Sequence, residues 1–280
     1  MRQIGINEIL KTVKDLSIEI NTRLGEDVVD ALKKAREEEK SPTGKEILRH
    51  LLENIRIAKE ESVPICQDTG LAVIFVDVGQ DVHLIGGDLR EAINEGVRQG
   101  YREGYLRKSV LDDPLMRKNT GDNTPAVIHI DIVPGNKIKI KMAAKGGGSE
   151  NSSAMKMMKP SDGEDGIKAF VLDTVRDAWA NPCPPIIVGI GIGGNFEMAP
   201  TLAKKALFRH LGDHNPAPHL ADLEREILKE VNGLWIGPEG FGGTVTALAV
   251  HIEAAPCHIA SLPVAVNIDC HVSRHREATL

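Results

Sequence analysis

The sequence is organised around a polar turn that runs directly into a long apolar segment. The turn is Cys66-Gln67-Asp68-Thr69-Gly70, and the apolar run Leu71–Val76 follows it without a break, at the start of the predicted strand Leu71–Val78. An apolar run of this length predicts a strand, and a loop at a strand end holds its polar groups at a fixed edge of a sheet. The turn combines a soft metal ligand, an amide, a carboxylate and a hydroxyl, so it is a candidate functional site.

Helical and strand patterns alternate along the chain. Apolar residues at three- and four-residue spacing predict helices at 6–24, 26–39, 45–60, 89–106, 163–180, 198–211 and 220–231. Further strands are predicted at 127–133, 137–144, 186–190, 245–252 and 262–268. The segment Pro134-Gly135-Asn136 between two of these strands indicates a β-hairpin. We expect an α/β fold of mixed β-sheets flanked by helices, a single domain over residues 1–280 with an N-terminal helical segment at 1–60.

Composition excludes several classes of protein. The chain has 280 residues, of which 41% are hydrophobic and 26% charged, so it is long enough to bury a sizeable core. A net charge of -6 and only two Trp, two Tyr and five Phe argue against binding nucleic acid. No apolar run approaches the roughly 20 residues of a membrane span, and the acidic amphipathic start is unlike a signal peptide. We therefore expect no membrane association and a cytoplasmic location.

Three of the four cysteines share a sequence context. Cys66 precedes a strand, Cys183 lies between prolines before a strand, and Cys270 ends one. Any one of them taken alone fits a small buried hydrophobe. Together they favour a metal site, yet the paired spacings typical of zinc and the four close thiolates typical of electron-transfer clusters are absent. Three distant thiolates suit an iron-sulfur cluster with one iron left open as a Lewis acid.

Two glycine-rich segments follow predicted strands. Lys145-Gly146-Gly147-Gly148-Ser149 frees the backbone to bring its amide groups close to an anion, although a flexible loop is the simpler interpretation. Gly191-Ile192-Gly193-Gly194-Asn195 resembles a dinucleotide-binding turn, but its glycine spacing does not fit one. We therefore exclude a nicotinamide site.

Five ordered motifs carry a resemblance to a known family. They are Cys66–Gly70, Asn119–Pro125, Lys145–Ser149, Asn181–Pro185 and the segment from Ser261 to His271. With them the chain resembles the α subunit of class I, iron-sulfur-dependent fumarase and its close relative L-tartrate dehydratase, over nearly the whole chain from about Val63. The resemblance implies that Cys66, Cys183 and Cys270 hold a 4Fe-4S cluster whose fourth iron binds the substrate.

The resemblance also implies the residues that contact the substrate, which are Gln67, Asp68, Arg107, Gly147 and His258. Asp68 would be the general acid or base, and His258 would act with it at the reacting substrate. Without the resemblance, Asp68 fits a turn-capping residue, His258 a polar residue without a catalytic role and Arg107 a surface charge. Arg102 and Arg117 are alternatives to Arg107, and Cys257 is expected to be structural. The chain departs from the family at 150–152, where Glu-Asn-Ser replaces the more frequent Ala-Asn-Lys.

The same resemblance implies a partner. In single-chain members a C-terminal domain supplies a further base and cationic groups, and this chain reaches Leu280 without such a region. We expect a separate β subunit that completes the active site at the α/β interface, in a higher oligomer of α and β acting on a small dicarboxylate.

The expected reaction is the reversible hydration of fumarate to L-malate. Dehydration of L-tartrate to oxaloacetate is the second candidate. A non-enzymatic iron-sulfur or zinc-binding protein is the alternative from another class, and a cofactor-free scaffold is the third.

Overall fold

The computed structural model describes all 280 residues, and their contacts divide the chain into two compact units. Unit 1 consists of Met1–Gly25, Asn54–Gly147 and Arg274–Leu280, and unit 2 consists of Glu26–Glu53 and Gly148–Ser273. Each unit is assembled from segments that are not consecutive in sequence, unlike two domains in tandem. The expectation of a single domain over residues 1–280 stays a prediction.

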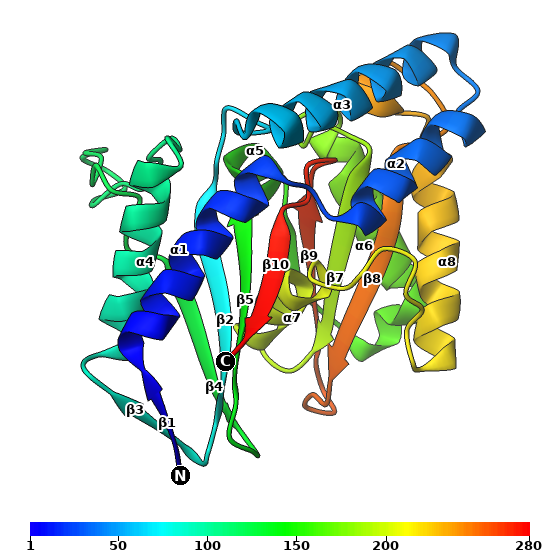
Figure 1. Cartoon of the computed structure of the whole chain (residues 1–280). Coiled ribbons are helices and arrows are strands. Elements are labelled where there is room, and N and C mark those ends of the chain that lie inside the picture. The colour runs from blue at the N-terminus through cyan, green and yellow to red at the C-terminus, as the bar shows by residue number, and fades with distance from the viewer. The chain divides into compact units, whose positions relative to one another are not determined.

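Helices and strands are interspersed along the chain, after three successive helices near its N-terminus (Figure 1). The helices are α1 Ile6–Thr22, α2 Glu26–Glu38, α3 Pro42–Glu61, α4 Leu89–Glu103, α5 Gly147–Asn151, α6 Gly163–Ala178, α7 Met198–Ala206 and α8 Pro218–Asn232, with 3₁₀ turns at Pro160–Asp162 and Pro238–Gly240. The strands are β1 Arg2–Gly5, β2 Leu71–Gly79, β3 Val82–Ile85, β4 Val127–Val133, β5 Ile138–Lys145, β6 Ala154–Met158, β7 Ile186–Gly193, β8 Ala247–Ala255, β9 Leu262–Asp269 and β10 His275–Thr279. The predicted α/β fold of mixed, helix-flanked sheets with an N-terminal helical segment is confirmed. None of the helices combines the length and the apolar character needed to cross a membrane.

Unit 1 is built on a four-stranded sheet in the order β10-β5-β2-β4, with β1 and β3 forming a separate parallel pair. Strand β2 is parallel to β4 and antiparallel to β5. Helices α1 and α4 lie side by side over this sheet (Figure 1). Their apolar stripes meet alternate residues of β2 and β5, such as Ile74 and Ile140, in one fully buried core.

The predicted hairpin between residues 127–133 and 137–144 is wrong. The two strands exist, but β2 lies between them and pairs with both. The turn crosses over the end of β2, where Asp81 N donates to Gly135 O at 2.9 Å. A side chain at Gly79 would place its Cβ 2.5 Å from Gly135 O, so only glycine permits this crossing. The sequence showed the turn but not the strand that separates its two arms.

The C-terminal segment, which the sequence shows only as a basic tail, is strand β10. It pairs antiparallel with β5 from His275, opposite Ala143, to Thr279, opposite Lys139. Arg276 reaches the end of α1 and donates to Leu24 O at 3.2 Å. A short strand of mainly polar residues gives no apolar alternation, and for that reason it was missed.

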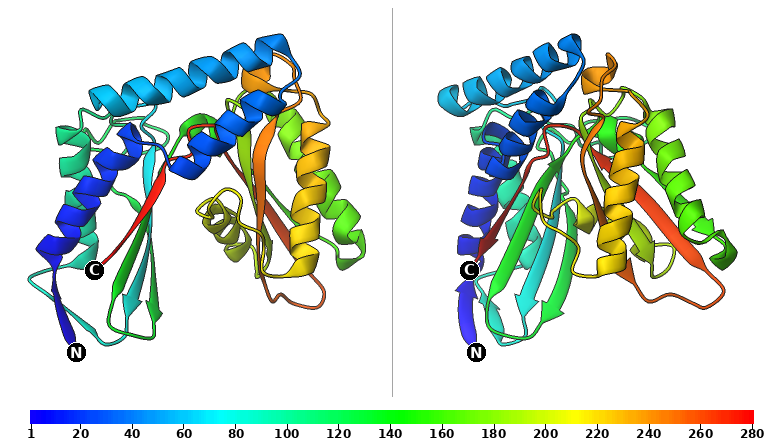
Figure 2. Two further views of the ribbon diagram at one scale, coloured as in Figure 1. Left: turned by 45° about the vertical axis from the view of Figure 1, so that its right-hand side comes forward. Right: turned by 90° about the vertical axis from the view of Figure 1, so that its right-hand side faces the viewer.

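Unit 2 is built on a second four-stranded sheet in the order β6-β9-β7-β8. Helices α6 and α8 cover one face of this sheet and α7 covers the other (Figure 2). On the α7 face, a Cβ at Gly189 would lie 2.3 Å from Ala203 O, and one at Gly191 would lie 2.0 Å from Ala199 O. The glycines therefore let α7 pack directly against the backbone of β7, which extends to Gly193 instead of ending at Ile190 as predicted.

Candidate functional site

The turn 66–70, called here the cysteine turn, is held in unit 1 by buried side chains. The Tyr101 hydroxyl, on α4, donates to Thr69 O at 2.7 Å. The buried guanidinium of Arg274 donates to Asp68 O at 2.7 Å. Burial raises the pKa of the Tyr101 phenol, so the hydroxyl stays protonated and remains a donor. The backbone of the cysteine turn is therefore fixed before any ligand binds.

The end of the cysteine turn requires glycine. Gly70 has φ +71°, in the left-handed region that other residues rarely adopt. A Cβ there would also lie 2.8 Å from backbone atoms of Lys145, which pairs with Leu71 at the start of β2. This close approach brings the cysteine turn to the beginning of the glycine-rich segment.

The carboxylate of Asp68 uses both of its oxygens. Oδ1 accepts from Gly70 N at 2.9 Å, the short-range contact of a turn-capping aspartate. Oδ2 accepts from Gly147 N at 2.8 Å. Two of the predicted substrate-contacting residues, far apart in sequence, are thus in direct contact, and the carboxylate is oriented from both sides.

Arg107 follows α4 and is tied to the same turn through its backbone. Thr69 Oγ1 donates to Arg107 O at 2.9 Å, while the exposed guanidinium of Arg107 has no polar partner. The two alternative arginines have other surroundings. The guanidinium of Arg102 lies 3.6 Å from the carboxylate of Glu103, and Arg117 lies in the exposed part of the segment that follows Arg107. Arg107 is the one of the three whose backbone is bonded to the cysteine turn.

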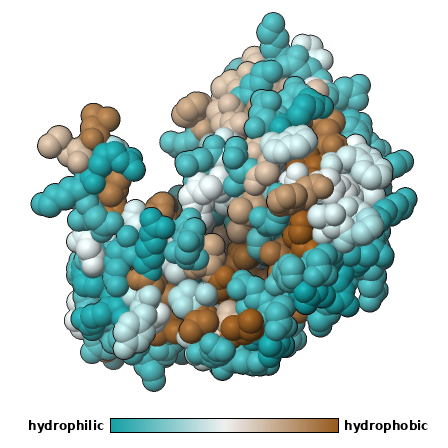
Figure 3. Space-filling view, turned by 90° about the horizontal axis from the view of Figure 1, so that it is seen from above, coloured by the Kyte–Doolittle hydropathy of each residue, from teal (hydrophilic) through white to brown (hydrophobic).

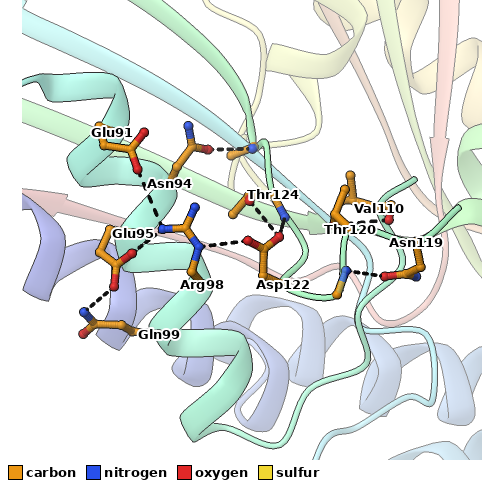
Figure 4. A network of polar contacts seen from close by, with 12 residues as sticks. Glu91, Asn94, Glu95, Arg98, Gln99, Val110, Asn119, Thr120, Asp122 and Thr124 are labelled. Atoms are coloured by element: carbon orange, nitrogen blue, oxygen red, sulfur yellow. Dashed lines mark hydrogen bonds and ion pairs between the residues drawn. The ribbon is translucent and has the colours of Figure 1, made fainter. Parts of the chain in front are cut away.

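The polar segment 107–125 returns to α4 through an ion pair. Arg98 Nε donates to Asp122 Oδ2 at 2.8 Å and also pairs with Glu95, and Thr124 N donates to Asp122 Oδ1 at 3.0 Å (Figure 4). Burial by itself would raise the pKa of the Asp122 carboxyl, but the Arg98 and Thr124 hydrogen bonds lower it to about 2. Asp122 therefore stays ionised and keeps the segment attached to α4.

Asn123 links the same segment to the cysteine turn. It is fully buried, it donates from Nδ2 to Gly70 O at 3.2 Å, and its Oδ1 accepts from Ser109 N at 2.7 Å. The middle of the segment projects beyond the end of α4, where Leu115 is 89% and Met116 81% exposed (Figures 1 and 3). The Asn119–Pro125 motif was recognised in the sequence, but this role of Asn123, like those of Tyr101 and Arg274, was missed because none of the three has a local signal.

In unit 2, the pairing of β7 with β9 places the Cys183 and Cys270 loops at the same end of the sheet. Strands β7 and β9 are antiparallel with Ile187 opposite Asp269, so the start of β7 and the end of β9 coincide. Cys183 precedes β7 and Cys270 follows β9. At this end of the sheet His271 N donates to Cys183 O at 3.3 Å. The thiol of Cys183 is exposed, and that of Cys270 is half-buried.

The glycine-rich segment forms the short helix α5. A Cβ at Gly148 would lie 3.2 Å from Asn181 O, so the absence of a side chain lets α5 approach the loop that carries Cys183. Glu150 pairs with Lys204 at 2.6 Å and accepts from Asn267 Nδ2 at 3.0 Å. The departure from the family pattern at 150–152 therefore supplies a local ion pair within unit 2.

His258 lies in an exposed turn between β8 and β9. Its Nδ1 accepts from Ala260 N at 3.1 Å, so the neutral ring carries its proton on Nε2 and can donate it outward. The neighbouring Cys257 donates to Ser261 O at 3.3 Å within the same turn. No hydrogen bond connects His258 to the loops of Cys183 and Cys270.

The predicted metal ligands are divided between the units, with Cys66 in unit 1 and Cys183 and Cys270 in unit 2. The structure contains no disulfide, and no group of three or more His, Cys, Asp or Glu side chains is arranged to hold a metal ion. The donor chemistry nevertheless fits a thiolate-bound cluster, because the three thiols are accessible and lie on constrained turns.

The fold and these turns define an α/β chain whose candidate site residues lie on loops at the ends of strands. The chain matches the family described as Fumarate hydratase (Fumerase) over residues 10–279, and it belongs to this family. It is 45% identical over 273 residues to a "Putative L(+)-tartrate dehydratase subunit alpha" of Methanocaldococcus jannaschii, covering 95% of each chain. It is 35% identical over 285 residues to the "L(+)-tartrate dehydratase subunit alpha" of Escherichia coli strain K12, covering 100% of this chain and 92% of the relative.

Proposed function

We propose that this chain is the α subunit of an iron-sulfur-dependent hydro-lyase that reversibly hydrates fumarate to L-malate. The observation that carries the proposal is the cysteine turn, in which Cys66, the doubly oriented carboxylate of Asp68 and the backbone anchor of Arg107 occur together. The family membership supplies the reaction class.

The residues of unit 1 suit the two tasks of the reaction. Hydration of a double bond next to two carboxylates needs a group that moves a proton at carbon and donors that hold the carboxylates. Asp68 is the proposed acid or base, and its orientation by Gly70 N and Gly147 N limits the directions in which it can act. Arg107, with its unpaired guanidinium, is the proposed bidentate carboxylate ligand.

Three further donors complete the proposed substrate contacts. Gln67 is exposed at the cysteine turn and offers an amide. Gly147 N donates to Asp68 Oδ2, so a substrate oxygen bound there would share this N–H with the carboxylate of Asp68. His258 offers an Nε2–H group, because its Nδ1 is occupied by Ala260 N. All three are proposed to bind carboxylate or hydroxyl oxygens of the substrate.

Cys66, Cys183 and Cys270 are proposed to hold the 4Fe-4S cluster, as the family motifs imply. When bound, the cluster would supply a Lewis-acidic iron for a substrate oxygen. A separate β subunit is proposed to complete the site, since both relatives carry the name subunit alpha.

L-tartrate is the second candidate substrate, and the names of the two relatives favour it. Fumarate and L-tartrate are both dicarboxylates, and they differ in the hydroxyl groups that they carry. A site that hydrogen-bonds a hydroxyl can discriminate strongly against a substrate that lacks it. The choice therefore depends on polar contacts and not on overall size.

The test is anaerobic purification of the chain with and without its β subunit, with iron, sulfide and cluster absorbance measured on each sample. Fumarate consumption and oxaloacetate formation from L-tartrate are then followed in parallel. Activity that requires both subunits and the cluster supports the proposal, and the faster substrate decides between the two candidates. Full turnover by this chain alone would contradict the need for a partner. One zinc per chain, or a cluster-loaded complex without hydro-lyase activity, would favour the binding-protein alternative.

A further inference from the structure

One carbonyl in unit 2 receives two contacts from a single histidine. His271 N donates to Cys183 O at 3.3 Å, and His271 Nδ1 lies 2.9 Å from the same oxygen. Because a carbonyl oxygen only accepts, the second contact requires the proton of the ring to be on Nδ1. His271 directly follows Cys270, so its backbone and side chain both connect the Cys270 loop to the Cys183 loop.

Glu239 holds the same imidazole from a third segment. Its Oε1 lies 3.1 Å from His271 Nδ1, close enough for an electrostatic contact, and is buried without a hydrogen-bond partner. A carboxylate at this distance favours the same Nδ1–H tautomer that the carbonyl requires. Nδ1–H therefore donates to Cys183 O, and the Glu239 carboxylate lies beside the same nitrogen, where it favours this orientation of the ring electrostatically.

The backbone of Glu239 is attached to the cysteine-bearing loop as well. Glu239 N donates to Pro184 O at 2.8 Å. Both Glu239, at φ +51°, and Cys183, at φ +54°, adopt the left-handed conformation, which is unfavourable for residues other than glycine. Such conformations persist where surrounding contacts fix them, and here the two residues fix each other's segments.

We propose that His271 is a positioning residue, oriented by Glu239, that holds the loops of Cys183 and Cys270 in register for cluster binding. The inference rests on the proposed function, because it assigns these two thiols to the cluster. Neither His271 nor Glu239 is placed among the ligands or the substrate contacts. Their effect on the cluster is exerted through the direction in which the two thiols are presented.

The first experiment needs no cluster. Hydrogen exchange is measured on the cluster-free full chain for wild type, His271→Ala, His271→Asn and the control His219→Ala, which removes an exposed histidine of α8. The Asn side chain can place its Nδ2–H close to the position of the lost Nδ1–H. Faster exchange at residues 183 and 239 is expected in His271→Ala, with recovery in His271→Asn and no change in His219→Ala.

The second experiment follows the cluster in the complex with the β subunit. Iron release to a ferrous chelator is timed under anaerobic conditions through the loss of cluster absorbance. His271→Ala is expected to release iron about 10-fold faster or more, the usual scale for loss of a residue that orients metal ligands. His271→Asn should recover most of the wild-type rate. Glu239→Gln, which keeps the side-chain shape but removes its charge, should have a smaller effect than His271→Ala.

The outcomes separate this inference from the function on which it rests. Equal exchange and equal iron release in wild type and His271→Ala would overturn the positioning role. Equal defects in His271→Ala and His271→Asn would also overturn it, because the Nδ1–H contact would then be irrelevant. A wild-type complex that binds no cluster would instead overturn the proposed function, whatever the exchange experiment shows. If His271→Ala does not fold, His271→Asn and Glu239→Gln are compared with wild type in both experiments. If Glu239→Gln then matches wild type and His271→Asn in amide exchange and in the rate of iron release to the chelator, the role of Glu239 is overturned.

Discussion

Gly147 N donates to Asp68 Oδ2 at 2.8 Å, which joins the glycine-rich segment to the cysteine turn. The two residues are distant in sequence and meet because Lys145, at the end of β5, pairs with Leu71, at the start of β2. A backbone amide that was expected to bind an anion therefore has a carboxylate of the protein itself as its partner. In the proposed reaction, this contact orients the group that moves the proton.

Replacing Asp68 by Asn should remove proton transfer while preserving the turn. The amide oxygen of Asn can still accept from Gly70 N, but its NH2 group cannot accept from Gly147 N, so stability should fall by about 1 kcal/mol, whereas kcat should fall about 10²- to 10⁴-fold. The matched control is Asp113→Asn, since Asp113 also caps an exposed turn by accepting from Leu115 N and Met116 N. A kcat close to wild type in Asp68→Asn, at equal cluster content, would leave Asp68 with only its capping role.

Replacing Arg107 by Ala should weaken substrate binding. Loss of a charge-assisted, bidentate contact with a carboxylate costs roughly 1.5–3 kcal/mol, which corresponds to a KM about 10- to 100-fold higher. Arg117→Ala is the control, because Arg117 lies in the exposed part of the same segment. Steady-state kinetics on both variants decide the assignment. A raised KM in Arg117→Ala together with a wild-type KM in Arg107→Ala would assign the carboxylate contact to Arg117.

Removing the Asp122 carboxylate should detach segment 107–125 from α4. Asp122→Asn is expected to cost about 1 kcal/mol of stability and to increase proteolysis within the segment, because Arg98 loses its charged partner. The folded-state pKa, about 2, is below the usual 3.8. The stabilisation is therefore complete above pH 4 and lost as the pH falls toward 2. Glu91→Gln is the control, since Glu91 is an exposed and more distant partner of Arg98, and equal proteolysis of both variants would contradict this role of Asp122.

Glu39 is expected to determine the stability of the loop 237–245. Its buried carboxylate accepts from the backbone N–H groups of Lys40, Ser41, Thr244 and Val245. Burial by itself would raise its pKa, but the hydrogen bonds from Ser41, Thr244 and Val245 together lower it.

Truncation to Ala would leave Val245 N buried without an acceptor and would remove the charged acceptor of Ser41 N and Thr244 N, at a cost of about 3 kcal/mol in the free energy of unfolding. Glu38→Ala, one residue earlier and exposed, should cost less than about 0.5 kcal/mol. Urea unfolding of both variants measures the difference. Equal stabilities would show that the Glu39 contacts make no net contribution.

His251 should make stability depend on pH below neutrality. Burial in unit 2 lowers its pKa from 6.5 to about 4. Between these values the unfolded chain binds a proton that the folded chain does not, so stability rises with pH. The contribution is fully present above pH 6.5 and lost as the pH falls to 4, by about 3 kcal/mol.

The measurement is urea unfolding from pH 7 to pH 4.5 for wild type, His251→Asn and the exposed control His219→Asn. The slope of stability with pH should decrease in His251→Asn and stay unchanged in His219→Asn. A wild-type slope in His251→Asn would assign the pH dependence to other groups.

The sequence by itself determined most of the local structure. Apolar spacing located the long helices and the central strands, since the period of the pattern depends only on the face that each element buries. The polar turn before Leu71 and the prolines around Cys183 identified the site segments for the same reason: their chemistry is local. Asp68 and Arg107 became candidates only through the family resemblance that these local motifs carry.

Only the tertiary structure decided which segments meet. The position of β2 between β4 and β5, the pairing of β10 with β5, and the contacts of Asn123, Arg274 and His271 all join residues far apart in sequence. Hydrophobic periodicity shows that one face of a helix or strand is buried, but it does not identify the element that packs against that face. Likewise, a buried polar side chain needs a hydrogen bond, but the sequence does not identify the partner. Those choices depend on the packing of the whole unit, and for that reason the sequence predicted the ligands and the catalytic candidates but not the residues that hold them in place.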